Sequence, residues 1–200
     1  MLKKHVIRFL QSLYERFQEL YWDLMAKKLH KERLARKENP DFKPVYYVID
    51  KYKPRSILDI GCGSGRFFGL YKEKGIKDVV GIDISERALK FARRRYPDIK
   101  TIKMRVEDLK FGYKRFDLAI SNRTLQHVTK RNIERAIKNI CNSCKMVYIN
   151  ELTDSNGIPE RIVIYKHDYE RLFEKYGFKL LEKGRINNQT WMLFADKSMG

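Results

Sequence analysis

The chain has 200 residues, of which 43% are hydrophobic, and this is typical of one globular domain with a short appendage. Its net charge of +18 favours either a polyanionic partner such as RNA or a solvated, lysine-rich surface. No run approaches ~20 apolar residues and no secretory signal is evident, so no membrane partner is expected. Three cysteines without a disulfide framework indicate a cytoplasmic protein.

Residues 2–37 contain neither glycine nor proline and predict one long helix. An apolar seam recurs along it at alternating intervals of four and three residues, formed by Val6, Leu10, Leu13, Phe17, Leu20 and Leu24. We expect this helix to bury a face, either as a lid over its own domain or against a second copy in a homodimer. Basic residues gather beyond the seam as far as Lys37, which indicates a solvated helix end or a phosphate-binding segment for RNA.

The segment Asn39-Pro40-Asp41 ends this helix, because proline disfavours a helical conformation in the residue before it. A short helix predicted from about residue 43 to 52 follows and carries two adjacent tyrosines, Tyr46 and Tyr47. The sequence therefore divides into an N-terminal helical extension, residues 1–52, and a larger domain, residues 53–200.

The most informative segment begins with an apolar, strand-like run, Ser56 to Ile60, that ends in a glycine-rich turn, Gly61 to Arg66. A second apolar run follows, Val79 to Asp83, and closes on an acid. Glycines allow a backbone to approach a ligand closely, and an acid at the end of the second strand can accept both ribose hydroxyls. The order of strand, turn, helix and strand predicts a nucleoside-binding βαβ unit.

The spacing of the glycines distinguishes between nucleosides. A dinucleotide site would carry a further glycine where Arg66 stands. The pattern present, Asp59-x-Gly61-x-Gly63-x-Gly65, resembles the first motif of class I S-adenosylmethionine-dependent methyltransferases. This cofactor has no phosphate to place at a helix N-terminus, and an acid at the strand end suits its ammonium group.

Three later segments extend the resemblance over roughly residues 55–151. Val106 to Leu109 follows a predicted third strand at 101–104. Residues 115–128 are similar to the fourth-strand motif of the small-molecule, type 11/25-like branch of the family. A fifth strand is predicted at 145–151, although Cys141-Asn142-Ser143-Cys144 replaces the Pro-Gly-Gly turn that usually precedes it.

Helices are predicted over 66–74, 85–95 and 129–140, with Ser85 and Thr129 as plausible N-caps. A helix over 167–176 and strands at 178–181 and 189–195 complete the chain. The resemblance implies a Rossmann-like α/β fold, a doubly wound seven-stranded sheet whose antiparallel closing hairpin places the final strand beside the fifth.

The resemblance also implies which residues bind S-adenosylmethionine. Asp59 and the turn Gly61, Cys62, Gly63, Gly65 and Arg66 would hold the methionine portion, Asp83 the ribose, Ile84 the adenine ring, Asp108 or Glu107 the adenine amino group, and Ser121 or Asn122 the sulfonium. Tyr46 and Tyr47 would close over the cofactor.

Methyl transfer depends mainly on proximity, and a general base is needed only when the acceptor is protonated. His127 and Arg123 are the candidate catalytic residues, the histidine as a base or merely a wall residue and the arginine as a holder of an anionic acceptor. The remaining candidate acceptor contacts are Gln126, Glu151, His167 and Tyr169.

These features predict an enzyme that moves a methyl group by in-line displacement from S-adenosylmethionine to an oxygen, nitrogen or carboxyl group of a small molecule. The alternative is a tRNA or rRNA methyltransferase that uses the basic end of the first helix, and a non-catalytic scaffold is the third hypothesis. No metal site is expected, because Cys141 and Cys144 provide only half of the four ligands of a structural zinc.

Overall fold

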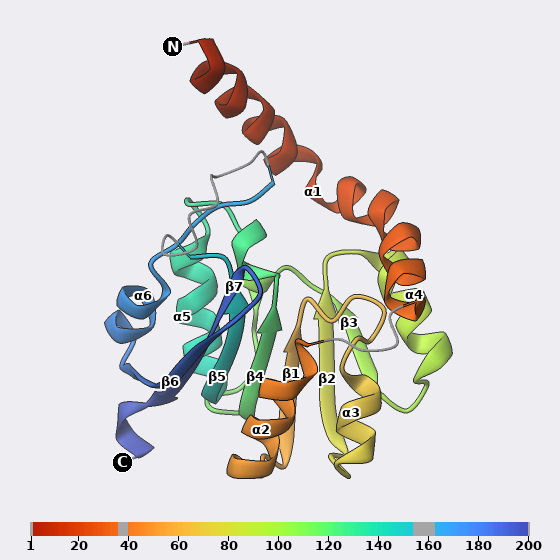
Figure 1. The fold of residues 1–200 in the computed structure, drawn as a ribbon, viewed down its shortest axis with the longest axis vertical. Helices are drawn as coiled ribbons and strands as arrows, with labels where there is room; N and C mark the ends of the chain where they lie inside the picture. Colours follow the sequence, from red (N-terminus) through yellow and green to blue (C-terminus); the bar gives the residue numbers. More distant parts are fainter. Residues whose placement is uncertain (1, 36–39, 154–162, 200) are drawn as a thin grey trace.

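The computed structural model describes residues 2–35, 40–153 and 163–199 (Figure 1). Its helices are α1 (Leu2–Ala35), α2 (Phe42–Tyr52), α3 (Phe68–Glu73), α4 (Glu86–Arg95), α5 (Ile133–Ser143) and α6 (Tyr169–Lys175). Its strands are β1 (Ser56–Ile60), β2 (Asp78–Asp83), β3 (Lys100–Lys103), β4 (Phe116–Asn122), β5 (Cys144–Glu151), β6 (Phe178–Ile186) and β7 (Gln189–Asp196). The expected end of the first helix, residues 36 and 37, lies outside the described residues.

The seven strands form one sheet in the order β3-β2-β1-β4-β5-β7-β6. Strands β1 to β5 are parallel, whereas β7 runs antiparallel to both β5 and β6, which confirms the expected fold and its closing hairpin. Because β1 pairs with both β2 and β4, the chain changes direction across the sheet at β1. Ligands of such sheets bind at the carboxyl ends of the strands beside this switch point.

Each face of the sheet has its own apolar layer. One layer joins the sheet to α2, α3 and α4 through side chains such as Val48, Phe68 and Leu89. The other joins it to α5 and α6 through Ile137 and Phe173. Helix α2, which the sequence groups with the N-terminal extension, therefore packs as part of the layered domain.

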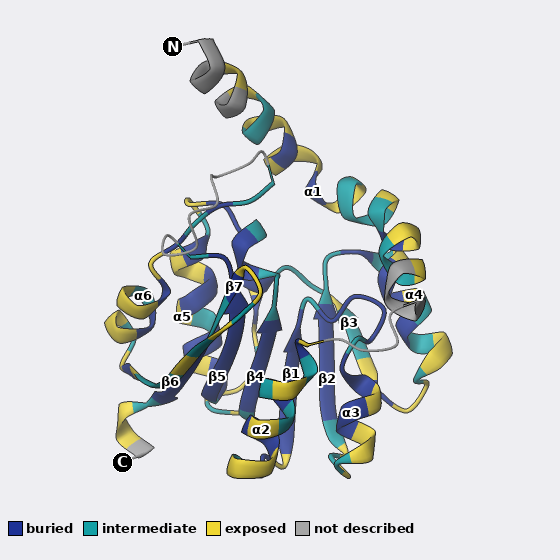
Figure 2. Cartoon of the chain, viewed as in Figure 1, coloured by how far each residue is buried: buried dark blue, intermediate teal, exposed yellow. Residues whose placement is uncertain are grey.

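Helix α1 uses a different face from the one its seam predicts. Val6, Leu20 and Leu24 are 51%, 57% and 65% exposed, whereas Tyr14 and Ala26 on the opposite side are buried (Figure 2). The helical geometry of α1 breaks at Phe17. The part after this break lies along α4, and the part before it projects beyond the domain (Figure 1). The seam therefore does not cover the chain's own domain.

No helix of the described segments is long and apolar enough to cross a membrane.

Two local predictions have different outcomes. Ser85 caps α4 as expected, since its hydroxyl accepts the backbone N–H of Ala88 at 3.1 Å. Thr129 is not the cap of α5, because that helix begins four residues later, at Ile133, after Asn132. The carbonyl of Thr129 accepts the N–H groups of both residues instead, so a preceding turn takes up the length that the sequence assigns to the helix.

The close packing of β2 on α3 provides a test of the fold. A Cβ at Gly81 would lie 2.6 Å from the Phe68 ring and 2.8 Å from the Cys62 sulfur, so Gly81→Ala should lower the free energy of unfolding by roughly 1–3 kcal/mol through overpacking. Gly112→Ala is the matched control, because no atom lies within 4 Å of its added methyl group. Urea unfolding measures both variants, and equal effects would contradict the packing argument.

Candidate functional site

The glycine turn and the acid after β2 form one hydrogen-bonded unit. Asp83 accepts the backbone N–H of Gly63 through Oδ2 and that of Ser85 through Oδ1, both at 2.8 Å. Gly61 has a positive φ of 70°, and a Cβ there would lie 2.1 Å from the Thr124 hydroxyl. The turn after β1 thus approaches the loop after β4 as closely as glycine permits.

A cavity of about 320 Å³ opens above this turn, at the carboxyl ends of β1, β2 and β4. The predicted site residues that line it are Gly61, Gly63, Arg66, Asp83, Ile84, Glu107, Asn122, Arg123, Gln126 and His127. The topology brings these together from segments more than sixty residues apart.

Helix α1 forms the roof of the cavity with Gln18, Trp22, Ala26 and Leu29. Its Asp23 accepts the Ser85 hydroxyl at 2.6 Å and the backbone N–H of Arg87 at 3.1 Å, which ties α1 to the start of α4. The Trp22 ring meets the His127 ring edge-on, with centroids 4.7 Å apart. None of the roof residues was identified from the sequence, because the regular apolar seam lies on the other side of the helix.

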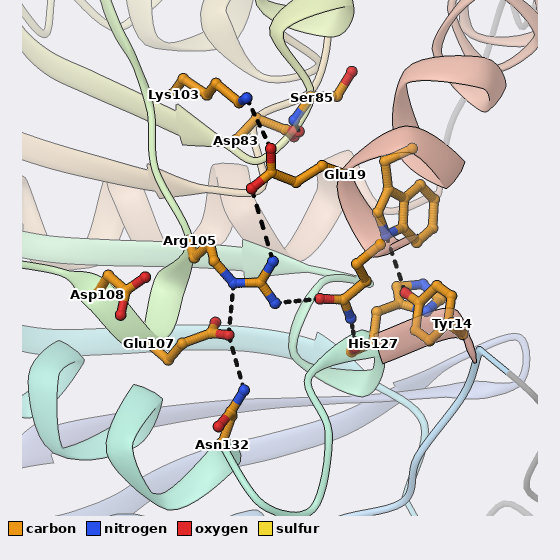
Figure 3. Close-up of polar contacts among 12 residues, drawn as sticks. Tyr14, Glu19, Asp83, Ser85, Lys103, Arg105, Glu107, Asp108, His127 and Asn132 are labelled. Carbon is orange, nitrogen blue, oxygen red and sulfur yellow. Dashed lines mark hydrogen bonds and ion pairs between the residues drawn. The ribbon is translucent and has the colours of Figure 1, made fainter. Parts of the chain in front are cut away.

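The acid after β3 belongs to a charged network. Arg105 donates through Nε to Glu107 at 2.9 Å and also contacts Gln18 and Glu19 of α1 (Figure 3). Glu107 is buried and also accepts the amide of Asn132 at 3.1 Å. Asp108 has a half-exposed side chain that pairs with Arg135 and does not line the cavity, so of the two neighbouring acids the geometry favours Glu107.

A second network is centred on Asp41, which is 1% exposed. Arg66 donates to its carboxylate at 2.8 Å, and Arg123 lies 3.4 Å from the other oxygen. The amides of Asn122 and Asn150 donate to it at 3.3 and 3.5 Å. Two guanidinium groups on the cavity wall therefore share one carboxylate. The sequence did not reveal this arrangement, because Asp41 follows a helix-breaking proline and is typical of a turn.

Glu151 organises the loop after β4. Its buried carboxylate accepts the backbone N–H groups of Thr124, Leu125 and Gln126 at 3.0–3.1 Å and the Ser121 hydroxyl at 3.0 Å. Burial raises the pKa of Glu151 to about 7, against the lowering effect of these hydrogen bonds. Glu151 and Ser121 do not line the cavity, so they position the residues that do.

His127 lines the cavity with both ring nitrogens engaged. Nδ1 is hydrogen-bonded to the Val163 carbonyl, and Nε2 lies 3.4 Å from the amide nitrogen of Gln126. Burial lowers the pKa of His127 to about 4. The imidazole is therefore neutral at neutral pH and a weak base, which agrees better with a wall and hydrogen-bonding role than with proton abstraction.

Several other predicted contacts lie away from the cavity. Tyr46 and Tyr47 donate from α2 to Glu73 and Glu182 at 2.6 and 2.8 Å, so they do not close over it. The hydrogen bond of His167 to the Val128 carbonyl, 2.9 Å, occupies that side chain in the interior. Tyr169 is also buried, as part of the apolar layer beneath α6, and neither residue lines the cavity.

Asp59 also points elsewhere, because side chains alternate along a strand. It shares the α3 face of β1 with Ile57, and its buried carboxylate accepts the Tyr71 hydroxyl at 3.1 Å. Cys62 and Gly65 complete the turn without lining the cavity. The structure gives Asp59 a hydrogen bond beneath the turn, and its contact with the methionine portion, directly or through water, stays a prediction.

Cys141 and Cys144 are buried, and burial raises the pKa of both thiols, that of Cys141 to about 12. Neither is suited to act as a nucleophile, since the thiolate is the reactive form. No group of three or more His, Cys, Asp or Glu side chains within the described ranges is arranged to hold a metal ion.

Comparison with known protein families matches the central part of the chain. Residues 57–146 match a family described as a methyltransferase domain. The chain contains a class I S-adenosylmethionine-dependent methyltransferase domain. S-adenosylmethionine is the cofactor of this domain, whose first motif is the glycine turn.

Solved structures share the fold of this methyltransferase domain. Magnesium protoporphyrin IX methyltransferase from Synechocystis, with bound S-adenosylmethionine, superposes with a TM-score of 0.73 at 14% identity, covering 90% of this chain and 96% of that one. The Burkholderia thailandensis 1,6-didemethyltoxoflavin-N1-methyltransferase gives a TM-score of 0.69 at 18% identity, covering 92% and 89%.

Curated relatives match over shorter stretches. A Haemophilus influenzae protein of uncharacterized function is 32% identical over 85 residues, which are 42% of this chain and 32% of the relative. The mRNA cap guanine-N(7) methyltransferase of Eremothecium gossypii is 30% identical over 99 residues, 42% of this chain and 23% of its own length. The chain thus spans a third or less of these two relatives.

The cavity fits S-adenosylmethionine on three counts. Its volume is near the lower end for small-ligand pockets, roughly 300–1,000 Å³. Asp83 is held with a fixed orientation by two backbone amides at the end of β2, where an acid suits the ribose hydroxyls. Glu107 provides a buried acceptor, and Gly61 and Gly63 provide backbone without side chains. When bound, the cofactor supplies a methyl carbon already activated by a sulfonium.

The pKa of His127 predicts how stability depends on pH. The ring is harder to protonate in the folded state, pKa about 4, than in the unfolded chain, roughly 6.5. Its neutral form therefore contributes stability above pH ~6.5 that is lost as the pH falls towards 4, by about 3 kcal/mol at most. The stability difference between wild type and His127→Gln, from urea unfolding at each pH, should shrink over this range. A constant difference would contradict the buried neutral ring.

The Asp41 network predicts a large effect of a small change. Asp41→Asn leaves Arg66 and Arg123 without their shared carboxylate and should lower the free energy of unfolding by about 3 kcal/mol. Asp98→Asn is the control, because its pair with Lys72 is exposed and contributes less than ~1 kcal/mol. Thermal and urea unfolding compare the two, and a loss at Asp41 no larger than that at Asp98 would overturn the assignment.

Proposed function

We propose that this protein transfers a methyl group from S-adenosylmethionine to a small-molecule acceptor that carries an anionic group. The observation that carries the proposal is the roof that α1 forms over the cavity. Gln18 and Trp22 lie directly above the residues expected to hold the cofactor, and the contact between Trp22 and His127 closes one side. A small acceptor can share this space, whereas a polymer strand would have to displace α1.

The cavity wall supports the anionic character of the acceptor. Arg66 and Arg123 both line the cavity, and their guanidinium groups converge on the carboxylate of Asp41. Guanidinium groups bind carboxylate and phosphate oxygens with strong, charge-assisted hydrogen bonds. Arg123 also has a positive φ of 57°. This backbone conformation is uncommon for residues other than glycine and often occurs at functional positions.

Methyl transfer needs the acceptor atom held in line with the methyl carbon and water kept out. Asn122, Arg123 and Gln126 orient groups at the end of β4, and Trp22 and His127 exclude water. No residue of the cavity is placed as a strong base, because the imidazole has a depressed pKa. The site therefore suits an acceptor that is already ionised, such as a carboxylate, or an amine that is neutral at working pH.

An RNA acceptor is the second candidate. The net charge of +18 favours a polyanion, and mRNA cap methyltransferases are among the proteins that match part of the chain. This function would require α1 to open, and it predicts binding that weakens steeply with salt as counterions are released.

The test is transfer of radiolabelled methyl from S-adenosylmethionine into a cell extract separated into small-molecule, RNA and protein fractions. We expect the label in a small molecule whose unmethylated form is retained on an anion-exchange resin. Asp83→Ala, which removes the acceptor of the ribose hydroxyls, should reduce this label at least ~100-fold. Label in RNA that disappears after RNase treatment would overturn the proposal in favour of the second candidate. Cofactor binding without label in any fraction would favour a scaffold.

A further inference from the structure

The outer side of α1 carries an unusual set of exposed apolar side chains. Eight large apolar residues are exposed among the described residues, and six of them lie on this helix. We call these six the outer stripe: Val6, Phe9, Leu13, Phe17, Leu20 and Leu24, each between 37% and 65% exposed. The stripe includes residues of both parts of α1, on either side of the break at Phe17. Monomeric soluble proteins rarely leave so continuous an apolar surface in water.

The outer stripe cannot turn inward, because the opposite face of α1 is fixed to the domain. Glu19 accepts a hydrogen bond from Lys103 at 2.8 Å (Figure 3). Asp23 accepts the Ser85 hydroxyl at 2.6 Å. Gln18 donates to the His127 carbonyl at 2.8 Å. The part of α1 after Phe17 is therefore held with its apolar side outward, and the stripe stays exposed in the part of the chain that the structure describes.

Charge narrows the choice of partner. Past Leu24, the same side of the helix continues with exposed Lys27 and Lys31, and Lys28 lies beside them. No acid occupies a stripe position between Val6 and Lys31. A partner for this surface has to be apolar along the stripe and anionic at its end.

Three partner classes meet these conditions to different degrees. A second copy would cover the stripe but would bring a second set of lysines at positions 27, 28 and 31 and no anionic group to pair with them at the stripe positions. RNA would match the charge but would leave the leucines and phenylalanines in water. A bilayer that contains anionic lipids offers both an apolar interior and negative headgroups.

We propose that α1 docks this protein on the surface of an anionic lipid bilayer. The outer stripe enters the boundary between headgroups and acyl chains, and Lys27, Lys28 and Lys31 contact anionic headgroups. The sequence suggested no membrane partner because it lacks a spanning segment, but a helix that lies on the surface needs none. This docking uses the outer face of α1 and is independent of the proposed methyl transfer on the inner face.

Co-sedimentation of the full chain with lipid vesicles tests the proposal. We expect binding to phosphatidylcholine vesicles in which phosphatidylglycerol is a third of the lipid, and at least ~10-fold weaker binding to pure phosphatidylcholine or at high salt. Leu20→Ser combined with Leu24→Ser should weaken binding at least ~10-fold. Lys27→Gln combined with Lys28→Gln and Lys31→Gln should weaken it by about 100-fold.

Two controls separate docking from folding and from catalysis. Tyr113→Ser changes an exposed aromatic residue, 80% exposed, in the loop before β4, and should leave vesicle binding unchanged. All variants should bind S-adenosylhomocysteine as the wild type does, because none of the altered residues lines the cavity.

Three outcomes would overturn the proposal. In the first, light scattering shows a dimer without lipid, Leu20→Ser combined with Leu24→Ser dissociates it, and the wild type does not bind vesicles. The stripe would then bind a second copy of the chain. Another is vesicle binding that the leucine variant retains in full, and the third is binding that is equal on neutral and anionic lipid.

Discussion

The hydrogen bonds of Asp83 connect the parts of the molecule that form the cavity. One carboxylate oxygen holds the glycine turn after β1, and the other holds the start of α4. The Ser85 hydroxyl at that start is in turn bonded to Asp23 of α1. A single acid at the end of β2 thereby aligns the floor, one wall and the roof. Its position depends on β1 lying between β2 and β4, so that three carboxyl ends meet.

Helix α1 has two faces with different physical roles. The inner face is aromatic and polar, and its groups find partners in Arg105, Ser85 and the His127 carbonyl. The outer face is apolar and has no cover within the described part of the chain. A roof over the cavity and the proposed docking surface can therefore occupy the same helix without competing for side chains.

Buried carboxylates organise the acceptor side of the site. Asp41 gathers two arginines and two asparagines, and Glu151 gathers three consecutive backbone amides. The donors around each carboxylate offset part of the cost of burying its charge, although burial still raises the pKa of Glu151 to about 7. The loop after β4 is consequently held in one conformation, which brings Arg123 and Gln126 to the cavity wall.

Local sequence determined the elements that depend on short-range rules. Glycine spacing, apolar runs and the Ser85 cap predicted the βαβ unit, and Gly61, Gly63, Asp83, Ile84 and Asn122 do line the cavity. Alternation along a strand already implies that Asp59 and Ile60 face opposite sides of the sheet. The resemblance to the family nevertheless assigned Asp59 to the cofactor side.

Tertiary structure decided what no local pattern contains. Which side of α1 faces the domain follows from distant partners such as Ser85 and Lys103, not from the heptad spacing of its leucines. The role of Asp41 likewise exists only because Arg66 and Arg123, from different loops, converge on it. The sequence by itself determined the fold, the cofactor and ten of the residues that line the cavity. The roof, the arginine pair and the exposed stripe depend on contacts between segments far apart in the chain, because burial and charge pairing are properties of the packed molecule.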